Sequence, residues 1–253
     1  MDLGLEGRVY AVTAATRGLG FASAEALVAD GAKVVVTGRG QAAVDEAVKR
    51  LGGAAAAVGV AANNAAADTG ERLIAAAKQQ FGRIDGVLIS AGGPPAGSML
   101  SASDEEWAGA FESVFLGAVR IARRFAGELG DGGVIGFVLS GSVREPIGGL
   151  AISNGLRPGL AMAAKTLAEE LGPRGIRVFG LLPARIDTER VQHLDSLGGD
   201  PEGARARAAA GIPLRRYGRP EEFGRVAAFY LSPAASYLTG VMVPVDGGAL
   251  RGI

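Results

Sequence analysis

The turn after the first strand-like segment combines residue types that can bind phosphate. The apolar run Val9–Thr13 is followed by Ala-Ala-Thr-Arg-Gly-Leu-Gly and then by a helix-like stretch. Glycines at such a turn let the backbone approach a pyrophosphate, and the N-terminus of the next helix supplies N–H groups and the positive end of a dipole. The sequence therefore predicts a phosphate-binding turn made of Thr13, Arg17, Gly18, Leu19 and Gly20.

Other kinds of chemistry are excluded by what the chain lacks. It has no cysteine, which excludes disulfides, thiolate metal sites and cysteine nucleophiles, and His193 is its single histidine. We therefore expect no metal centre. The 253 residues include 26 basic and 26 acidic side chains, so their charges cancel. Net charge gives no drive toward nucleic acid or an anionic membrane, and we expect neither as a partner.

The N-terminal segment Met1–Arg8 lacks the charged start and apolar run of a signal peptide. No stretch reaches the roughly 18 apolar residues that a membrane-spanning helix needs. We accordingly expect a cytoplasmic protein.

Short β-branched runs alternate with longer helix-like stretches along the whole chain. The strand candidates are Val9–Thr13, Lys33–Thr37, Ala56–Val60, Gly86–Ser90, Val134–Leu139, Arg177–Leu182 and Val241–Val245. The helix-like stretches lie near 20–30, 41–51, 69–81, 104–129, 154–172 and 220–232. This repetition predicts an α/β fold, a three-layer Rossmann-like doubly wound sheet with about seven parallel strands.

The chain shows no linker and no change of composition that would divide it. We therefore expect residues 1–253 to form a single domain. Segment 184–216 is polar, rich in Gly, Arg and Ala, and follows the sixth strand. An insertion at the carboxyl end of a strand in such a fold is typical of a substrate lid.

Several motifs resemble those of the short-chain dehydrogenase/reductase family. The family has Thr-Gly-x-x-x-Gly-x-Gly at the first turn, where this chain has Ala14 in place of the first glycine. Segment 90–92, Ser-Ala-Gly, resembles the family's Asn-Asn-Ala-Gly motif, in which Ile89 and Ser90 replace the two asparagines. Segments 183–188 and 245–248 resemble its nicotinamide-contacting Pro-Gly motif and its closing signature. The resemblance covers essentially the whole chain and implies cofactor contacts from Ala91, Gly92, Pro183, Ile186 and Thr188.

The end of the second strand indicates which nicotinamide dinucleotide binds. Dinucleotide sites for NAD place an Asp or Glu here to bind the adenosine ribose, but this chain has Gly38. Arg39 follows it, and together with Arg17 it suits a ribose 2′-phosphate, so NADP(H) is favoured over NAD(H). The alternative is that both arginines are solvated surface side chains. Asn63 replaces the family's adenine-contacting aspartate and can supply a similar polar contact.

The family's catalytic Asn, Ser, Tyr and Lys are mostly replaced. Val114 stands at the asparagine position, and either Ser140 or Ser142 matches the serine. Counting back from the following helix places Ser153 at the tyrosine position and Arg157 at the lysine position. Serine is a far weaker acid than a phenol, and arginine replaces only the charge of the lysine.

The replacements are polar and resemble an atypical branch related to β-ketoacyl carrier-protein reductases. That branch has Ser-Val-x-Glu-Pro and Ser-Asn-x-x-Arg, which this chain matches at 142–146 and 153–157. The resemblance implies a catalytic group made of Ser142 (or Ser140), Glu145, Asn154 and Arg157. The alternative for Glu145 is a helix cap or a surface pair with Arg144.

These features favour an NADP(H)-dependent oxidoreductase that acts on a carbonyl/alcohol pair with non-standard acid/base residues. A small molecule or an acyl thioester, in a reaction like that of a 3-oxoacyl thioester reductase, is the expected substrate. The alternative is a non-catalytic dinucleotide-binding or regulatory protein on the same fold. A lyase- or epimerase-like activity is a third possibility.

The chain is also expected to form a homotetramer. In the family, the helices that correspond to 104–129 and 154–172 pair across a two-fold axis, and Val241–Ile253 resembles a second interface. Here these helices carry more apolar positions than one sheet face needs, including Phe111, Val114, Phe115, Leu160, Met162 and Leu167.

Overall fold

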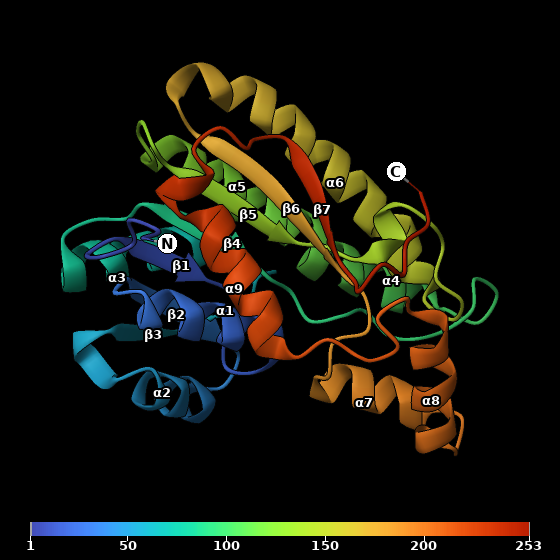
Figure 1. Cartoon of the computed structure of the whole chain (residues 1–253). Coiled ribbons are helices and arrows are strands. Elements are labelled where there is room, and N and C mark those ends of the chain that lie inside the picture. Colours follow the sequence, from blue (N-terminus) through green and yellow to red (C-terminus); the bar gives the residue numbers. More distant parts are fainter. Residues whose placement is uncertain (1, 253) are drawn as a thin grey trace.

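In a computed structural model, which describes residues 2–252, the strands form one parallel sheet in the order β3-β2-β1-β4-β5-β6-β7 (Figure 1). All six neighbouring pairs are parallel. The predicted fold class is therefore confirmed. The strands are β1 (Val9–Val12), β2 (Lys33–Gly38), β3 (Ala57–Ala61), β4 (Gly86–Ile89), β5 (Val134–Val138), β6 (Arg177–Pro183) and β7 (Val241–Val245).

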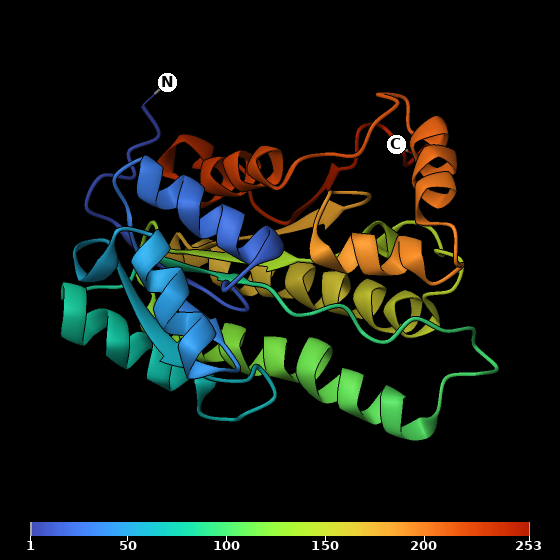
Figure 2. The same cartoon turned by 90° about the horizontal axis from the view of Figure 1, so that it is seen from below.

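Helices cover both faces of this sheet, as can be seen in Figure 2, where the helices lie on either side of the strands. One face carries α1 (Gly18–Ala29), α2 (Gln41–Arg50) and α9 (Pro220–Leu231). The other carries α3 (Thr69–Phe81), α4 (Asp104–Ala110), α5 (Gly117–Glu128) and α6 (Ala151–Leu171). A π-helical turn, η2 (Phe111–Leu116), joins α4 to α5. The remaining short turns are η1 (Gly53–Ala55), η3 (Gly141–Val143), η4 (Gly172–Arg174) and η5 (Pro233–Ala235).

Segment 184–216, the predicted lid, forms two helices beyond the carboxyl ends of the strands: α7 (Glu189–Ser196) and α8 (Pro201–Gly211). Its polar composition gave no helical period, although Val191 of α7 packs with Ala208 and Ala209 of α8 in a small apolar cluster. Thr188 and Asp200 accept backbone N–H bonds at the two N-termini.

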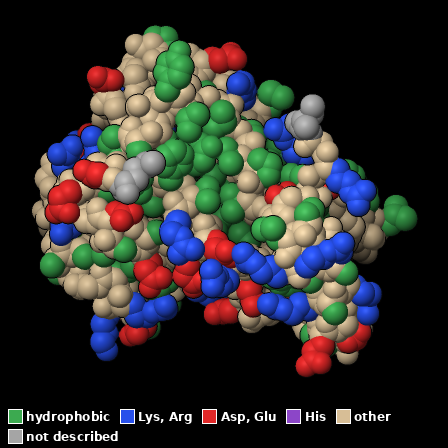
Figure 3. Space-filling model, in the orientation of Figure 1, with side chains coloured by type: hydrophobic (Ala, Val, Ile, Leu, Met, Phe, Trp, Pro, Cys, Tyr) green, Lys and Arg blue, Asp and Glu red, His purple; other side chains and the backbone are tan. Residues whose placement is uncertain are grey.

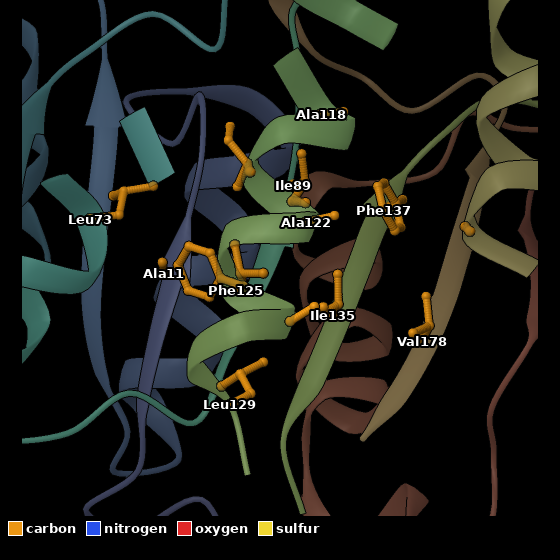
Figure 4. Packing of buried hydrophobic residues seen from close by; sticks show 14 of the residues in the cluster. Ala11, Leu73, Ile89, Ala118, Ala122, Phe125, Leu129, Ile135, Phe137 and Val178 are labelled. Atoms are coloured by element: carbon orange, nitrogen blue, oxygen red, sulfur yellow. The ribbon is translucent and has the colours of Figure 1, made fainter. Parts of the chain in front are cut away.

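The core consists of one apolar layer on each face of the sheet. In the layer of Figure 4, Phe125 of α5 packs against strand residues such as Ala11, Ile89 and Ile135, all at most 2% exposed. The five residues of β5 are buried throughout, as the continuous apolar runs predict. This double burial fixes the strands and hence the positions of the loops that follow them.

Two apolar residues expected at a subunit interface belong to the interior instead. Val114 and Leu160 are each 2% exposed and pack within the chain's own clusters. Phe111 and Met162, by contrast, are 42% and 67% exposed. The helical period explains the difference, because only one side of each helix faces the sheet.

Ala14 adopts a backbone conformation that favours glycine. Its φ is +48°, in the left-handed region, at the position where the family has its first glycine. The turn cannot relax easily, since a Cβ on Gly20 would lie 2.6 Å from the Ala14 carbonyl oxygen. The chain thus keeps the family's turn geometry with a residue that strains it.

Ala14→Gly should raise the free energy of unfolding by about 1 kcal/mol. Glycine removes a left-handed strain of about 1–2 kcal/mol and loses about 0.4–1 kcal/mol to the greater freedom of the unfolded chain. Urea unfolding measures the change. Ala15→Gly is the matched control: Ala15 is fully buried without positive φ, so glycine there should lower stability. If both variants are destabilised, the turn is not strained.

Candidate functional site

The phosphate-binding turn has a helix N-terminus that is open to an anion. α1 begins at Gly18, whose φ is +57°, and Arg17 at its N-cap makes no side-chain cap hydrogen bond. The first turn of α1 also contains no acidic residue. The first backbone N–H groups and the helix dipole therefore remain available, and the turn fits a dinucleotide pyrophosphate.

A buried hydroxyl ties this turn to the next loop. The Thr13 hydroxyl accepts from the Ser90 N–H at 2.9 Å and donates to the Ser90 carbonyl, which also accepts from the Asn64 side chain at 2.8 Å. Thr13 is fully buried, so it supports the cofactor turn rather than lining it. The neighbouring Asn63, predicted to contact the adenine, is exposed, and its side chain accepts from the Ala65 N–H. Burial, which sequence alone does not show, distinguishes the two asparagines.

The end of β2 is shaped to exclude the acidic residue that NAD sites use. A Cβ on Gly38 would lie 2.4 Å from the Cγ2 atom of Thr16. Arg39 is exposed, and neither an ion pair nor a side-chain hydrogen bond of it is found among the described residues. Arg17 is also exposed and forms an ion pair with Glu189 at the start of α7. Both guanidinium groups can therefore reach an anionic ligand.

Two buried serine hydroxyls meet at the predicted catalytic position. The Oγ atoms of Ser142, in η3, and Ser153, in α6, lie 3.2 Å apart, and each residue is at most 5% exposed. Ser140 has a different task, since its Oγ accepts the Ser142 N–H at 3.1 Å and caps η3. Of the two serines left open by the sequence, Ser142 is thus the one paired with the residue at the family's tyrosine position.

Arg157, also in α6, is an almost completely buried cation. Its Nη1 donates to the Val138 carbonyl at the end of β5, and its Nε has no hydrogen-bond partner. Burial lowers the pKa of its guanidinium to about 10. One turn of α6 separates Ser153 from Arg157, so both project from the same helix face. An unsatisfied buried donor is costly, so the Nε atom adds to the cost of burying this cation.

Among the described residues, neither Asn154 nor Glu145 forms a side-chain hydrogen bond with Ser142 or Ser153. The Asn154 side chain accepts from the Ile147 N–H at 3.0 Å and donates to the Ile147 carbonyl at 2.9 Å. It therefore shapes the loop after η3. Glu145 lies on that loop with its side chain exposed, and no ion pair with Arg144 is found among the described residues.

The family's asparagine position is apolar here. Val114 lies in the π-helical turn η2 and packs with Ala110, Ile152 and Leu156, next to Trp107. The Val114 side chain thus offers no polar group that could hold a water chain.

The predicted nicotinamide motif connects the sheet to the lid. Pro183 ends β6, Ile186 is buried, and Thr188 caps α7. A Cβ on Gly18 would lie 3.8 Å from the Thr188 methyl group, so the motif faces the phosphate turn. In the opposite loop, Ala91 is partly buried and Gly92 is exposed.

Tyr217 stabilises the lid internally. Its hydroxyl lies 3.0 Å from the carboxylate of buried Asp195, which also pairs with Arg185. Burial and this carboxylate raise the pKa of Tyr217. The Tyr217 hydroxyl is thus occupied by a structural hydrogen bond to Asp195.

Among residues 2–252, no helix has both the length and the apolar character required to cross a membrane. The same part of the chain contains no group of three or more potential metal-binding side chains.

The chain is similar to oxidoreductases over nearly its whole length. The family described as enoyl-(acyl carrier protein) reductase matches residues 13–249. An uncharacterized oxidoreductase of Methylorubrum extorquens is 34% identical over 248 residues, covering 96% of this chain and 98% of the relative. Human dehydrogenase/reductase SDR family member 4 is 35% identical over 249 residues, covering 96% and 88%. The structure of L-sorbose reductase from Gluconobacter frateurii, complexed with NADPH and L-sorbose, is similar with a TM-score of 0.91 at 29% identity. The comparison covers 100% of this chain and 100% of that chain.

Asn154→Ala should loosen the loop after η3, because it removes both hydrogen bonds to Ile147. The expected cost is about 1–2 kcal/mol, and amide exchange at Ile147 should become faster. Hydrogen-exchange mass spectrometry measures this. Asn154→Asp keeps the acceptor for the Ile147 N–H and should show a smaller change. Unaltered exchange in both variants would mean that the pair of bonds does not hold the loop.

Proposed function

The chain belongs to the short-chain dehydrogenase/reductase family and is an oxidoreductase of that type; on this premise we propose that it transfers hydride between NADP(H) and a carbonyl/alcohol pair through a rebuilt catalytic site. The observation that carries the proposal is the pair of buried hydroxyls of Ser142 and Ser153 at the carboxyl edge of the sheet. The substrate would be a small carbonyl compound or a 3-oxoacyl thioester.

In this site the two serines orient and polarise the substrate carbonyl. The dinucleotide supplies the hydride when bound, and the hydroxyls donate to the oxygen on which negative charge develops. Arg157, buried in α6, adds positive potential without being an acid. The proton that completes the alcohol comes from water, because Glu145, the residue that the sequence suggested for a relay, is exposed on the loop after η3 and forms no side-chain hydrogen bond with the serine pair within residues 2–252. Because no matched acid is present, turnover should be slower than in tyrosine-bearing relatives.

The cofactor preference follows from the end of β2. Thr16 fills the space that an acidic side chain at position 38 would need. Arg39 and Arg17 provide two guanidiniums for a ribose 2′-phosphate. Our proposal is therefore NADP(H) rather than NAD(H), in a cytoplasmic enzyme.

The proposal includes a homotetramer. In the view of Figure 3, hydrophobic side chains gather between α9 and α6, over the edge of the sheet where β7 lies. Val241, Met242 and Val243 of this edge strand are only partly buried, and Met162 of α6 is 67% exposed. A second copy that covers this surface would bury it.

Arg39→Ala should weaken NADPH binding about tenfold or more and leave NADH binding nearly unchanged. The loss is one charge-assisted contact of about 1.5–3 kcal/mol to the 2′-phosphate. Fluorescence titration of the two cofactors measures it. Equal weakening of both cofactors would contradict the preference.

Ser142→Ala and Ser153→Ala should each lower turnover by about 10²-fold, since each removes one donor to the developing oxyanion. Both should still bind NADPH. Ser140→Ala is the matched control, because it removes a nearby hydroxyl that caps η3. If the wild-type chain binds NADPH but turns over no ketone or 3-oxoacyl thioester, the regulatory alternative gains support instead.

Sedimentation at micromolar concentration should show a tetramer. Met162→Glu, which places a charge on the exposed side of α6, should shift the chain toward smaller species without unfolding it. A stable wild-type monomer would refute this part of the proposal.

A further inference from the structure

Arg190 reaches from the lid to the loop that follows β4. It lies in the first turn of α7, and its Nη2 donates to the Pro94 carbonyl at 2.6 Å. The guanidinium rests directly on Gly93, where a Cβ would lie 2.8 Å from Nε and 3.3 Å from Cζ. Any side chain at position 93 would displace Arg190, so the glycine makes room for the cation.

Arg190 differs from the other arginines of the lid in its surroundings. Four of them form ion pairs with carboxylates: Arg185 with Asp195, Arg205 with Asp187, Arg207 with Asp200 and Arg216 with Glu222. Among the residues from 184 to 216, all of them described, Arg190 and Arg215 have no carboxylate partner. Arg215 is exposed, whereas Arg190 is partly buried. Only Arg190 therefore combines burial with an uncompensated charge.

This combination is unfavourable unless an anion completes it. Burial lowers the pKa of the Arg190 guanidinium, which reflects the loss of water around its charge. A guanidinium carries five N–H donors, and the Pro94 carbonyl is its single hydrogen-bond acceptor within residues 2–252. The remaining donors form the planar fork that binds carboxylate or phosphate oxygens in pairs.

The position of Arg190 connects it to the proposed site. Pro94 follows β4 and the Ser90 brace, and Thr188, two residues before Arg190, faces the phosphate turn. A ligand held at the carboxyl edge beneath α7 would thus meet this guanidinium.

We infer that Arg190 binds an oxyanion of the ligand held under the lid, so that the site selects a charged partner. The inference rests on the proposed function. The oxyanion is a carboxylate or a phosphate, and it has two possible sources: an acidic group of the substrate, or the pyrophosphate of the cofactor.

Arg190→Gln tests this, because glutamine removes the charge and keeps an N–H donor near the position of the arginine Nε, while Arg190→Lys keeps the charge. The substrate arm compares KM for a 3-oxo acid with KM for its methyl ester. The cofactor arm measures Kd for NADPH and NADH without substrate. Glu189→Gln is the control, because it breaks the ion pair between α7 and Arg17 and should change KM for the acid and for the ester equally.

For a substrate source, Arg190→Gln should raise KM for the acid about tenfold or more and leave the ester within about twofold, with partial retention in Arg190→Lys. For a cofactor source, NADPH and NADH should weaken equally, since both contain the pyrophosphate. If acid and ester change alike and both cofactor affinities stay constant, Arg190 only ties the lid and the inference is wrong.

If no substrate turns over, the proposed function fails but the inference is still decided. Quenching of bound NADPH fluorescence by a 3-hydroxy acid and by its methyl ester then replaces the KM comparison. Acid-selective loss of quenching in Arg190→Gln supports the inference, and equal responses with unchanged cofactor affinities overturn it.

Discussion

The brace between Thr13 and Ser90 is the constraint on which the site depends. β1 has β2 on one side and β4 on the other, and the chain leaves the sheet in opposite directions from this point. Loops that diverge there need a connection, which the Thr13 hydroxyl provides by bonding both backbone groups of Ser90. Because the hydroxyl is buried, water does not compete with it. The phosphate turn and the loop that carries Gly92 to Pro94 therefore keep a fixed separation, and Arg190 of the lid is placed relative to both.

The active site that we propose on this scaffold has a different proton chemistry. A phenol beside a lysine can give a proton near neutral pH, but Ser153 cannot, and Arg157 stays charged even with its pKa lowered to about 10. Val114, at the family's asparagine position, contributes apolar packing and no polar group. What remains is electrostatic: two hydroxyl dipoles and one buried cation directed at one edge of the sheet. In our proposal, such a site would stabilise a developing oxyanion better than it protonates one, and we expect proton delivery to be the slow step.

The sequence was sufficient for the sheet because strand–helix alternation and continuous apolar runs depend on local patterns. Each of the seven strands lies within about one residue of its predicted range. Contacts between distant segments could not be predicted in this way. Asn64 was missed because only burial separates it from Asn63, and the bond of Asn154 to Ile147 depends on how the loop after η3 folds back. Arg190 gave no signal either, since its environment arises from Gly93, which is far away in sequence.

The ties of the lid differ in strength, and that difference determines what a ligand can change. Asp195 is 6% exposed and binds Arg185 and Tyr217, so removing it would leave the buried Tyr217 hydroxyl without this partner. The Arg17–Glu189 pair is exposed on both sides, and pairs of this kind contribute only about 0.2–1 kcal/mol. A ligand phosphate can therefore replace Glu189 as the partner of Arg17 at little cost, while the interior of the lid stays intact. The exchange would occur at the end of α7 from which Arg190 also reaches inward. The proposed ligand-binding charges thus lie in the outer ties of α7, whereas the inner tie through Asp195 involves neither of them.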